Sequence, residues 1–291
     1  MDKYILECYV NAGEIAKRIL NEAASRVKPG ALILDVVRFA EDEIVSGGAE
    51  IAFPVNISLN EAAAHDTASE GDSRVFKAGD LVKVDLGVHV NGYVADTALT
   101  VDLGNNSLLV EASRSALDAA IGLVRPGIKT GELGAAIQTE IEKRGFRPVS
   151  NLTGHGLGYF LLHGIPTIPN VAINGGTVIE EGMTFAIEPF ASSGIGQVSD
   201  GPRVEIFSQI SKKPVRLPSA RKLMAEIEKR KTLPFSRRWY SDTNTDINLV
   251  RLCQQGILRG YPVLRDVPGS LVSQAEHTLI VTEDGCIVTT A

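Results

Sequence analysis

The segment Asp85-Leu86-Gly87-Val88-His89-Val90-Asn91-Gly92-Tyr93-Val94-Ala95-Asp96 has strand-forming residues on both sides of a turn and an aspartate at each end. Asn91-Gly92 lies between strand-forming residues, which favours a two-residue type I′ turn and predicts a β-hairpin. With that turn Gly87 faces Asp96, and Asp85 lies diagonal to Asp96 at about 7 Å or somewhat less. Gly87, which has no side chain, is expected to leave room between the two carboxylates. Carboxylates this close repel each other strongly unless a cation lies between them.

The sequence around this hairpin recurs later in the chain. Three blocks repeat in the same order: Val27-Lys28-Pro29-Gly30 as Val124-Arg125-Pro126-Gly127, Gly79 to Asp85 as Gly182 to Glu188, and Ala95 to Val101 as Ala275 to Val281. Apolar residues at helical spacing predict two helices before each set of strands, over 4–27, about 31–44, 108–124 and 130–143. We therefore expect an α+β fold built from a duplicated unit, two helices followed by strands.

The second copy of the unit is interrupted. Asp85 and Asp96 are 11 residues apart, whereas the corresponding Glu188 and Glu276 are 88 apart. Two further helical patterns lie in the gap, over 219–231 and 245–258, with Thr243 or Thr245 as the expected N-cap of the second. We therefore predict a main domain of residues 1–208 and 261–291 and an inserted helical subdomain of residues 209–260.

The insertion is locally basic. One interpretation is a contact with RNA or a ribosome, and the simpler one is a solvated helix face. The basic residues are Lys212, Lys213, Arg221, Lys222, Lys229, Arg230, Lys231, Arg237 and Arg238.

Composition excludes several classes of protein. The chain has 291 residues, of which 44% are hydrophobic and 22% charged, as in globular proteins. A net charge of −6 does not indicate the positively charged surface that binding of a nucleic-acid substrate requires. The sequence has no run of about 18 apolar residues, so we predict no membrane-spanning helix. Cys8, Cys253 and Cys286 are odd in number and far apart, so we expect no disulfide framework and a cytoplasmic location.

By the repeat, Glu188 and Glu276 should form a pair equivalent to Asp85 and Asp96. Four carboxylates then converge if the two halves pack face to face. Burying four negative charges together is too unfavourable without compensation, and two divalent cations would neutralise them.

His155 is the histidine best placed to join the carboxylates. Glycines on both sides, Gly154 and Gly156, let the backbone approach another group closely. Oxygen ligands with one or two imidazoles suit Mn, Fe, Co or Zn. His89 and His277 are expected to be structural or exposed, because strand alternation and rise place them away from the acidic groups.

In this order, Asp85, Asp96, His155, Glu188 and Glu276 resemble the five metal ligands of the pitta-bread metallopeptidases. The resemblance covers essentially the whole chain, including the insertion that marks type 2. The short N-terminus, which lacks the charged extension of eukaryotic members, indicates an archaeal type. The motifs that resemble type 2 methionine aminopeptidases are Ala64-His65-Asp66, Lys83-Val84-Asp85-Leu86-Gly87, Gly154-His155-Gly156, Leu162-His163-Gly164 and Ala186-Ile187-Glu188-Pro189-Phe190.

This resemblance implies a pseudo-twofold pitta-bread fold, with an antiparallel sheet covered by helices. It implies a monomer that removes the initiator methionine from nascent proteins when the second residue is small. It also implies two divalent ions (Co, Mn, Fe or Zn), with Asp85 on one, His155 and Glu188 on the other, and Asp96 and Glu276 bridging. A hydroxide between the ions would attack the first peptide bond.

The remaining roles also follow from the resemblance. Glu188 would move the proton, and His65 and His163 would be the substrate histidines that stabilise the tetrahedral intermediate and the scissile amide. The methionine pocket would be apolar, because aromatic rings make favourable contacts with a thioether. Its walls would be Phe53, Phe190 and Tyr261, beside Leu162 and His163.

Two alternatives compete with this interpretation. An Xaa-Pro peptidase of the same fold would resemble the chain only with a large extra N-terminal domain, whereas the helical pattern here begins at residue 4. A non-catalytic binding protein built on the fold would lack metal ligands, whereas all five are present.

Overall fold

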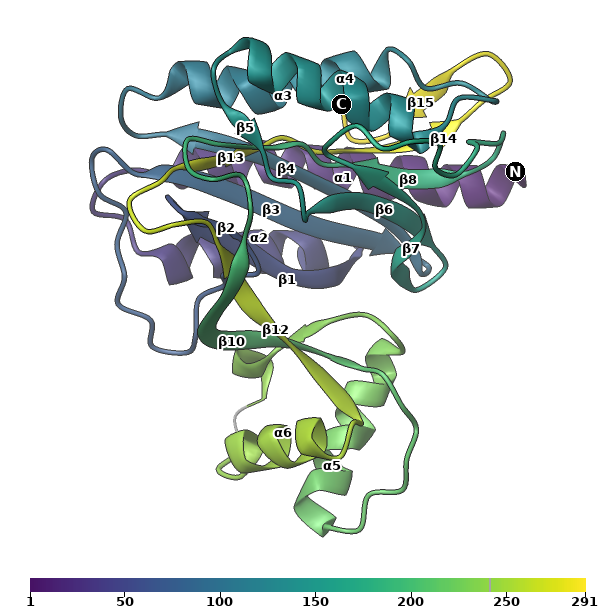
Figure 1. Ribbon diagram of the computed structural model, residues 1–291. Helices are drawn as coiled ribbons and strands as arrows, with labels where there is room; N and C mark the ends of the chain where they lie inside the picture. The colour runs from purple at the N-terminus through teal and green to yellow at the C-terminus, as the bar shows by residue number, and fades with distance from the viewer. Residues whose placement is uncertain (241) are drawn as a thin grey trace.

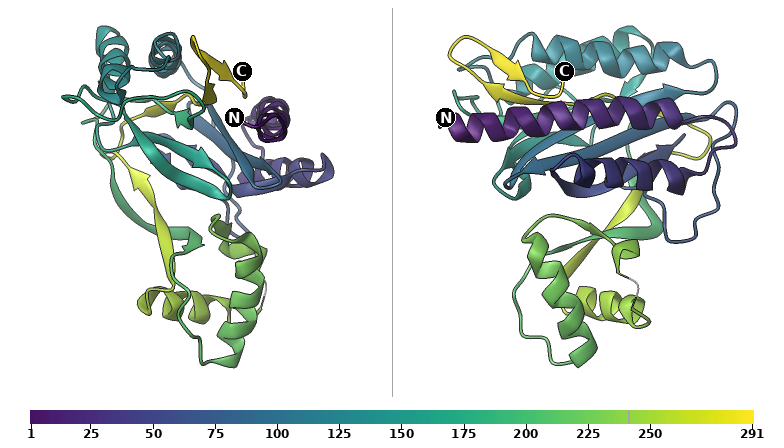
Figure 2. Two further views of the ribbon diagram at one scale, coloured as in Figure 1. Left: turned by 90° about the vertical axis from the view of Figure 1, so that its right-hand side faces the viewer. Right: turned by 180° about the vertical axis from the view of Figure 1, so that it is seen from behind.

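A computed structural model of the chain describes residues 1–240 and 242–291. Antiparallel strands form the body, and the helices α1 to α4 pack against it (Figure 1). Seen from behind, α1 and α2 lie in front of the strands, and α3 and α4 run along the top of the body (Figure 2, right). A smaller group of elements with α5 and α6 lies below the body, and the long strands β10 and β12 lead into it (Figure 1).

The first half of the body contains the hairpin. Val90 pairs with Tyr93 and Gly87 with Asp96, and φ is positive at both turn residues, 51° at Asn91 and 89° at Gly92. The predicted turn and register are therefore confirmed. The elements of this half are α1 (Lys3–Arg26), α2 (Ile33–Ser46), β1 (Glu50–Leu59), β2 (Ala62–Ala64), β3 (Leu81–Val90) and β4 (Tyr93–Asp102).

Helix α1 covers this hairpin. Ala12, Ala16, Ile19 and Ala23 are completely buried and recur at the three- and four-residue spacing of one helix face. That face contacts β3 and β4. Small alanine side chains let the helix approach the sheet closely, so the hairpin is fixed from outside.

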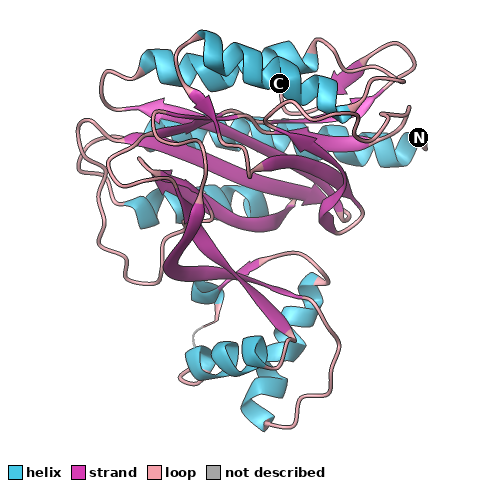
Figure 3. Ribbon diagram, viewed as in Figure 1, coloured by secondary structure: helices cyan, strands magenta, loops and turns pink. Residues whose placement is uncertain are grey.

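The second half repeats the order of two helices followed by strands. Strands β8 and β14 pair antiparallel, as β3 and β4 do in the first half, although the insertion separates them in sequence. Figure 3 shows the strands of both halves within the body, and an isolated bridge between Ala98 and Glu276 joins their two sheets. The predicted α+β class is confirmed. The elements are α3 (Ser107–Ile121), α4 (Thr130–Lys143), β5 (Arg147–Pro148), β6 (Thr153–Gly158), β7 (Leu161–Pro169), β8 (Thr184–Ile187), β9 (Phe190–Ser192), β13 (Val272–Gln274), β14 (His277–Val281) and β15 (Cys286–Val288).

The two halves are joined through β4 and the residue before β14. The backbone N–H of Glu276 donates to the carbonyl of Ala98 at 3.0 Å. The N–H of Asp96 donates to Oγ1 of Thr278 at 2.7 Å. Because this junction is also where two of the predicted ligands lie, the contact between halves fixes their backbone positions.

The inserted elements have an apolar cluster of their own, which includes Leu223, Ile227, Phe235 and Leu252. They are β10 (Ser199–Gln209), α5 (Pro218–Ile227), η1 (Glu228–Arg230), β11 (Phe235–Ser236), η2 (Arg237–Trp239), α6 (Thr245–Gln254) and β12 (Leu258–Arg265). Strands β10 and β12 run across residues 208/209 and 260/261, so the division at those residues stays a prediction.

The predicted helix over 245–258 is wrong at its end. Helix α6 stops at Gln254, Gly256 follows with a φ of 63°, and Leu258 begins β12. The left-handed conformation at a glycine ends the helix. The predicted N-cap is wrong too, since Asn244 holds that position.

No helix among the described residues is long and apolar enough to cross a lipid bilayer.

Candidate active site

A cavity of about 290 Å³ lies where the strands of both halves meet the insertion. Every residue that the sequence nominated as a ligand, catalytic group or pocket wall lines it. These are Phe53, His65, Asp85, Asp96, His155, Leu162, His163, Glu188, Phe190, Tyr261 and Glu276. Residues from β1, β3, β4, β6, β12 and the ends of β8 and β14 therefore converge at one place.

The acidic groups come from the two related strand pairs. Asp85 lies on β3 and Asp96 on β4, and they occupy the diagonal positions that the hairpin predicts. The ladder between β8 and β14 ends where Ile187 pairs with His277. The next residues along these strands, Glu188 and Glu276, therefore face each other as the second acidic pair.

His155 lies among these carboxylates. Its Nε2 atom is 3.4 Å from Oε1 of Glu188 and 3.7 Å from Oδ2 of Asp96. One ligand atom each of Asp96, His155 and Glu276 lie within 4.8 Å of one another, and all three residues are buried. This trio has the spacing to hold a metal ion.

The glycines beside His155 are required by close packing. A Cβ at Gly154 would lie 2.3 Å from the carbonyl oxygen of Ala186, and one at Gly156 would lie 2.0 Å from that of Ile165. Strand β6 thus fits between β7 and β8 only without side chains at these positions. The predicted reason for the Gly-His-Gly motif agrees with this geometry.

The predicted reason for Gly87 is wrong. A Cβ at Gly87 would lie 2.2 Å from Cε1 of Phe53, which pairs with Gly87 on the neighbouring strand β1. The space is therefore filled by an aromatic ring and is not an open gap between carboxylates. Gly87 brings Phe53 against the hairpin.

Burial and mutual repulsion keep protons on the acidic groups. Burial raises the pKa of Asp85 to about 7. Burial and the neighbouring carboxylates raise the pKa of Asp96, Glu188 and Glu276 well above the ordinary range. Burial lowers the pKa of His155 to about 3, so its imidazole is neutral at pH 7 and can act as a ligand.

The site fits a cation because its polar atoms lack other partners. Among the described residues, Oδ1 of Asp85, Oδ1 of Asp96 and Oε1 of Glu276 are buried without a hydrogen bond. Buried polar atoms are almost always paired, so three unpaired carboxylate oxygens facing one cavity are suited to a hard or borderline divalent ion.

Two further histidines lie at the cavity wall. Nδ1 of His65 lies 3.3 Å from the carbonyl of Pro262. Since a carbonyl only accepts, Nδ1 carries the proton. Burial lowers the pKa of His65 to about 4. The ring of His163 lies 4.6 Å from that of His155, centre to centre. A neutral His65 leaves Nε2 free to accept a hydrogen bond.

The predicted pocket walls differ in surroundings. Phe53 and Leu162 belong to one apolar cluster and Phe190 to another, so both phenylalanines also pack in the core. Tyr261 contacts the His65 ring at 5.4 Å between centres, and its hydroxyl is 3.0 Å from Oγ of Ser208. Tyr261 lies inside β12.

Sequence reasoning missed Gln274. Its Nε2 atom donates to Oε2 of Glu276 at 3.3 Å and Oδ2 of Asp85 at 3.4 Å, bridging acids from the two halves. It lies two residues before Glu276, so strand alternation could have found it. Asn56, opposite Asp85 on β1, was also missed although it lines the cavity.

The histidines predicted to lie outside the site do so. Nδ1 of His89 accepts from the N–H of Gly92 at 3.2 Å, and Nδ1 of His277 is 2.9 Å from Oγ1 of Thr290. Neither lines the cavity.

A family model described as metallopeptidase family M24 matches residues 7–233, which is most of the chain. The chain belongs to metallopeptidase family M24. Within this family, the methionine aminopeptidase of Archaeoglobus fulgidus is 48% identical over 291 residues and the match covers 100% of both chains. These matches confirm the resemblance that the sequence motifs indicated.

Solved structures in the family's fold support the same assignment. A methionine aminopeptidase from Thermotoga maritima superposes with a TM-score of 0.75 at 26% identity, covering 100% of this chain and 98% of that one. A thermophilic Arx1 superposes with a TM-score of 0.90 at 18% identity, covering 99% and 91%; at this identity the likeness concerns the fold alone. The M24 pitta-bread fold is thus confirmed.

Proposed function

We propose that this M24 metallopeptidase removes the initiator methionine from nascent proteins whose second residue is small. The observation that carries the proposal is the convergence of four carboxylates and His155 on one cavity with unpaired buried oxygens. Full-length relatives named methionine aminopeptidase support the choice of substrate. Because nascent proteins are synthesised in the cytoplasm, we expect the protein to act there. We also expect it to act as a monomer.

The five groups would hold two divalent ions (Co, Mn, Fe or Zn). Asp85 would bind one, His155 and Glu188 the other, and Asp96 and Glu276 both. Such ions, when bound, acidify a water molecule and polarise a carbonyl. Their positive charge would also let all four carboxylates lose their protons, which burial alone opposes.

The chain's own groups would then handle the proton and the substrate. Glu188 would accept a proton from the attacking water and return it to the leaving amine. His65 and His163 would donate or accept hydrogen bonds at the scissile amide, where charge develops. Phe53, Leu162 and the other predicted walls would bind the methionine side chain.

Peptide cleavage tests the proposal. Protein loaded with Mn or Co should cleave Met-Ala-Ser faster than an Xaa-Pro peptide, and chelator should abolish the cleavage. Faster cleavage of Xaa-Pro would favour the alternative peptidase. Activity that survives removal of the metal would contradict the metal-dependent mechanism.

The pocket wall is tested separately. We expect Phe53→Ala to raise the Michaelis constant for Met-Ala-Ser by about 2- to 10-fold, because it removes aromatic contact with the thioether. An unchanged constant would exclude Phe53 from the pocket.

We also infer that the insertion contacts an anionic surface, such as ribosomal RNA. Residues 209–260 contain 12 Lys and Arg against 4 Asp and Glu, a net charge of +8, so the rest of the chain carries −14. Lys212 and Arg221 are exposed on it. A polyanion would be attracted to this end of the molecule and repelled by the body.

Binding to ribosomes at rising salt concentration tests this contact. The double variant Lys212→Glu, Arg221→Glu should bind several-fold more weakly, with a shallower dependence on salt. The matched double variant Lys28→Glu, Lys77→Glu, on the body, should bind like the wild type. An equal loss of ribosome binding in both double variants would mean that binding depends on the net charge of the protein and not on the insertion.

A further inference from the structure

His65 has a backbone conformation that its own segment does not enforce. Its φ is 63°, in the left-handed region that residues other than glycine rarely adopt. Residues 65–74 contain no helix or strand. With no backbone ladder in the segment, side-chain and single backbone contacts hold His65 where it lines the cavity.

Two strands hold the residues at His65 directly. The carbonyl of Asp66 accepts from the N–H of Ile57 on β1 at 2.7 Å. The His65 ring contacts the carbonyl of Pro262 on β12, and Pro262 pairs with Val204 on β10. The residue before Val204 is Arg203, so β10 brings a guanidinium to the same place.

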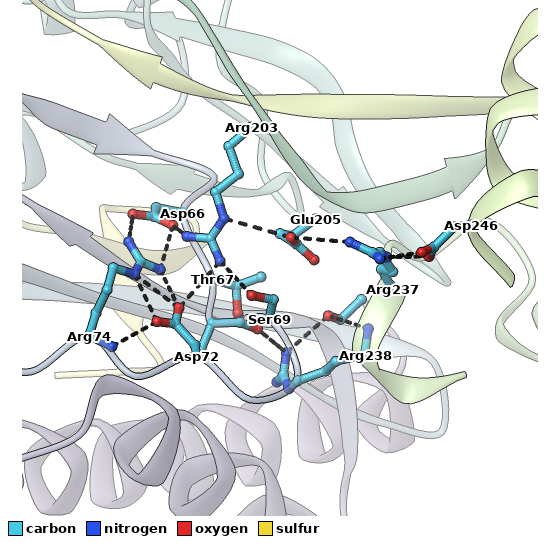
Figure 4. Close-up of polar contacts among 12 residues, drawn as sticks. Asp66, Thr67, Ser69, Asp72, Arg74, Arg203, Glu205, Arg237, Arg238 and Asp246 are labelled. Carbon is cyan, nitrogen blue, oxygen red and sulfur yellow. Dashed lines mark hydrogen bonds and ion pairs between the residues drawn. The ribbon is translucent and has the colours of Figure 1, made fainter. Parts of the chain in front are cut away.

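Arg203 binds the side chain that follows His65 (Figure 4). Its Nη1 donates to Oδ1 of Asp66 at 2.7 Å, and Asp66 is only 5% exposed. Arg74 binds the same carboxylate from within the segment, at 2.8 and 3.2 Å. Arg203 also reaches Asp72 at 3.4 Å, so it ties both ends of the segment to β10.

A second arginine from the insertion side holds the next residues. Arg238, on η2, donates to the carbonyl of Ala68 at 3.3 Å and to Oγ1 of Thr67 at 3.4 Å. It also pairs with the buried carboxylate of Glu41. The segment that carries His65 is thus held by cations from the elements that lead into and form the insertion (Figure 4).

We propose that Arg203 is a positioning residue for His65: its ion pair with Asp66 fixes the backbone on which the His65 ring is aimed into the cavity. This inference rests on the proposed role of His65. Arg203 does not line the cavity itself, so it acts through His65 and not on the substrate. A fork-shaped guanidinium suits this task, because it binds two groups in fixed directions.

Kinetics of three variants test the proposal. Arg203→Met should fold, because Asp66 keeps its pairing with Arg74. Its kcat for Met-Ala-Ser should fall about 10- to 100-fold, the effect of a small misplacement at a reacting centre, with a smaller change in KM. Arg203→Lys, which keeps the charge, should recover part of the loss. The control Arg38→Met removes an exposed pair with Glu70 in the same segment and should behave like the wild type.

A double-mutant cycle separates positioning from general support of the fold. In a His65→Ala background, Arg203→Met should cause no further loss of kcat, because the group through which it acts is gone. If Arg203→Met lowered kcat by the same factor in both backgrounds, the proposal would be overturned.

The ring of His65 gives a readout that needs neither metal nor substrate. In metal-free protein its Cε1–H NMR signal, assigned by its disappearance in His65→Ala, should shift or broaden in Arg203→Met but not in Arg38→Met. An unchanged signal would overturn the proposal. If His65→Ala itself left kcat unchanged, the proposed catalytic role of His65 would fail, and the NMR signal alone would decide whether Arg203 positions the ring.

Discussion

At the scale of single residues, the site is a cluster of buried carboxyl groups. When these groups are ionised, the protein itself does not neutralise their negative charge. Asp96 is 3% exposed and Glu276 is 1% exposed, and both carry a buried oxygen without a hydrogen bond. Gln274 offers one amide group to two acids from different halves. A single neutral donor offsets little of the cost of burying several charges, so the residues favour protons or cations.

Asp96 is the residue whose charge should matter most for a bound cation. We expect Asp96→Asn to weaken Mn binding and to lower kcat by roughly 100-fold or more, since even residues outside the ligand shell change metal affinity by about 10- to 100-fold. Calorimetric titration with Mn and peptide kinetics would measure the two effects. Asp102→Asn, at the far end of the same strand, serves as the control. Wild-type turnover in Asp96→Asn would mean that Asp96 does not bridge two metal ions.

The acidic groups should make the metal-free protein less stable as pH rises. Their folded pKa values are raised, so above the unfolded carboxyl pKa of about 4 the folded state binds more protons than the unfolded state. The free energy of unfolding then falls with rising pH. His155 and His65 have lowered pKa values and act in the opposite direction, but only below the unfolded histidine pKa of about 6.5.

Thermal unfolding in excess chelator would measure this. Between about pH 6.5 and about pH 8 the buried Lys83, whose pKa burial lowers to about 7, opposes the carboxyl effect. The four carboxyl groups outnumber this one amine, so Tm should fall. With Mn present the fall should disappear, because the cation favours the charged carboxylates. A Tm that rose with pH in chelator would show that the acids are already ionised in the folded protein.

At the scale of elements, close backbone approach decides which side chains reach the cavity. Strand β6 passes between two neighbours only because both residues beside His155 are glycine. Strand β3 admits the Phe53 ring for the same reason at Gly87. The glycines thus specify positions of other side chains.

Gly87→Ala tests this effect on a pocket wall. The new methyl group would overlap the Phe53 ring, so we expect the ring to move, KM for methionine peptides to rise, and stability to fall by about 1–3 kcal/mol. Gly122→Ala, where a Cβ would make only contacts of 3.5 Å or longer, is the control. If both variants had the wild-type KM, Phe53 would not be set by Gly87.

At the scale of the whole molecule, the insertion has an apolar cluster separate from those of the body. A smaller cluster gives a lower free energy of local opening. We expect backbone amides of α5 and α6 to exchange with deuterium faster than those of β3 and β4, measured by mass spectrometry. Equal protection would mean that the insertion unfolds only together with the body.

Local patterns in the sequence predicted the order of the helices and strands and the two acidic pairs. Local rules act over few residues, so the Asn91-Gly92 turn fixed the register that places Asp85 near Asp96. Internal repetition extended that geometry to Glu188 and Glu276. The end of α6 was missed because the apolar pattern continues past Gln254, whereas Gly256 ends the helix and Leu258 pairs with β10.

What lies between and behind these groups depends on how the elements pack in three dimensions. Phe53 fills the space at Gly87, Gln274 bridges two acids, and Arg203 holds the segment of His65. Each contact joins residues that are far apart in sequence, or on different strands, and depends on how whole elements pack. Spacing along a chain specifies faces and registers, but it does not specify which distant side chain fills the space that a glycine leaves.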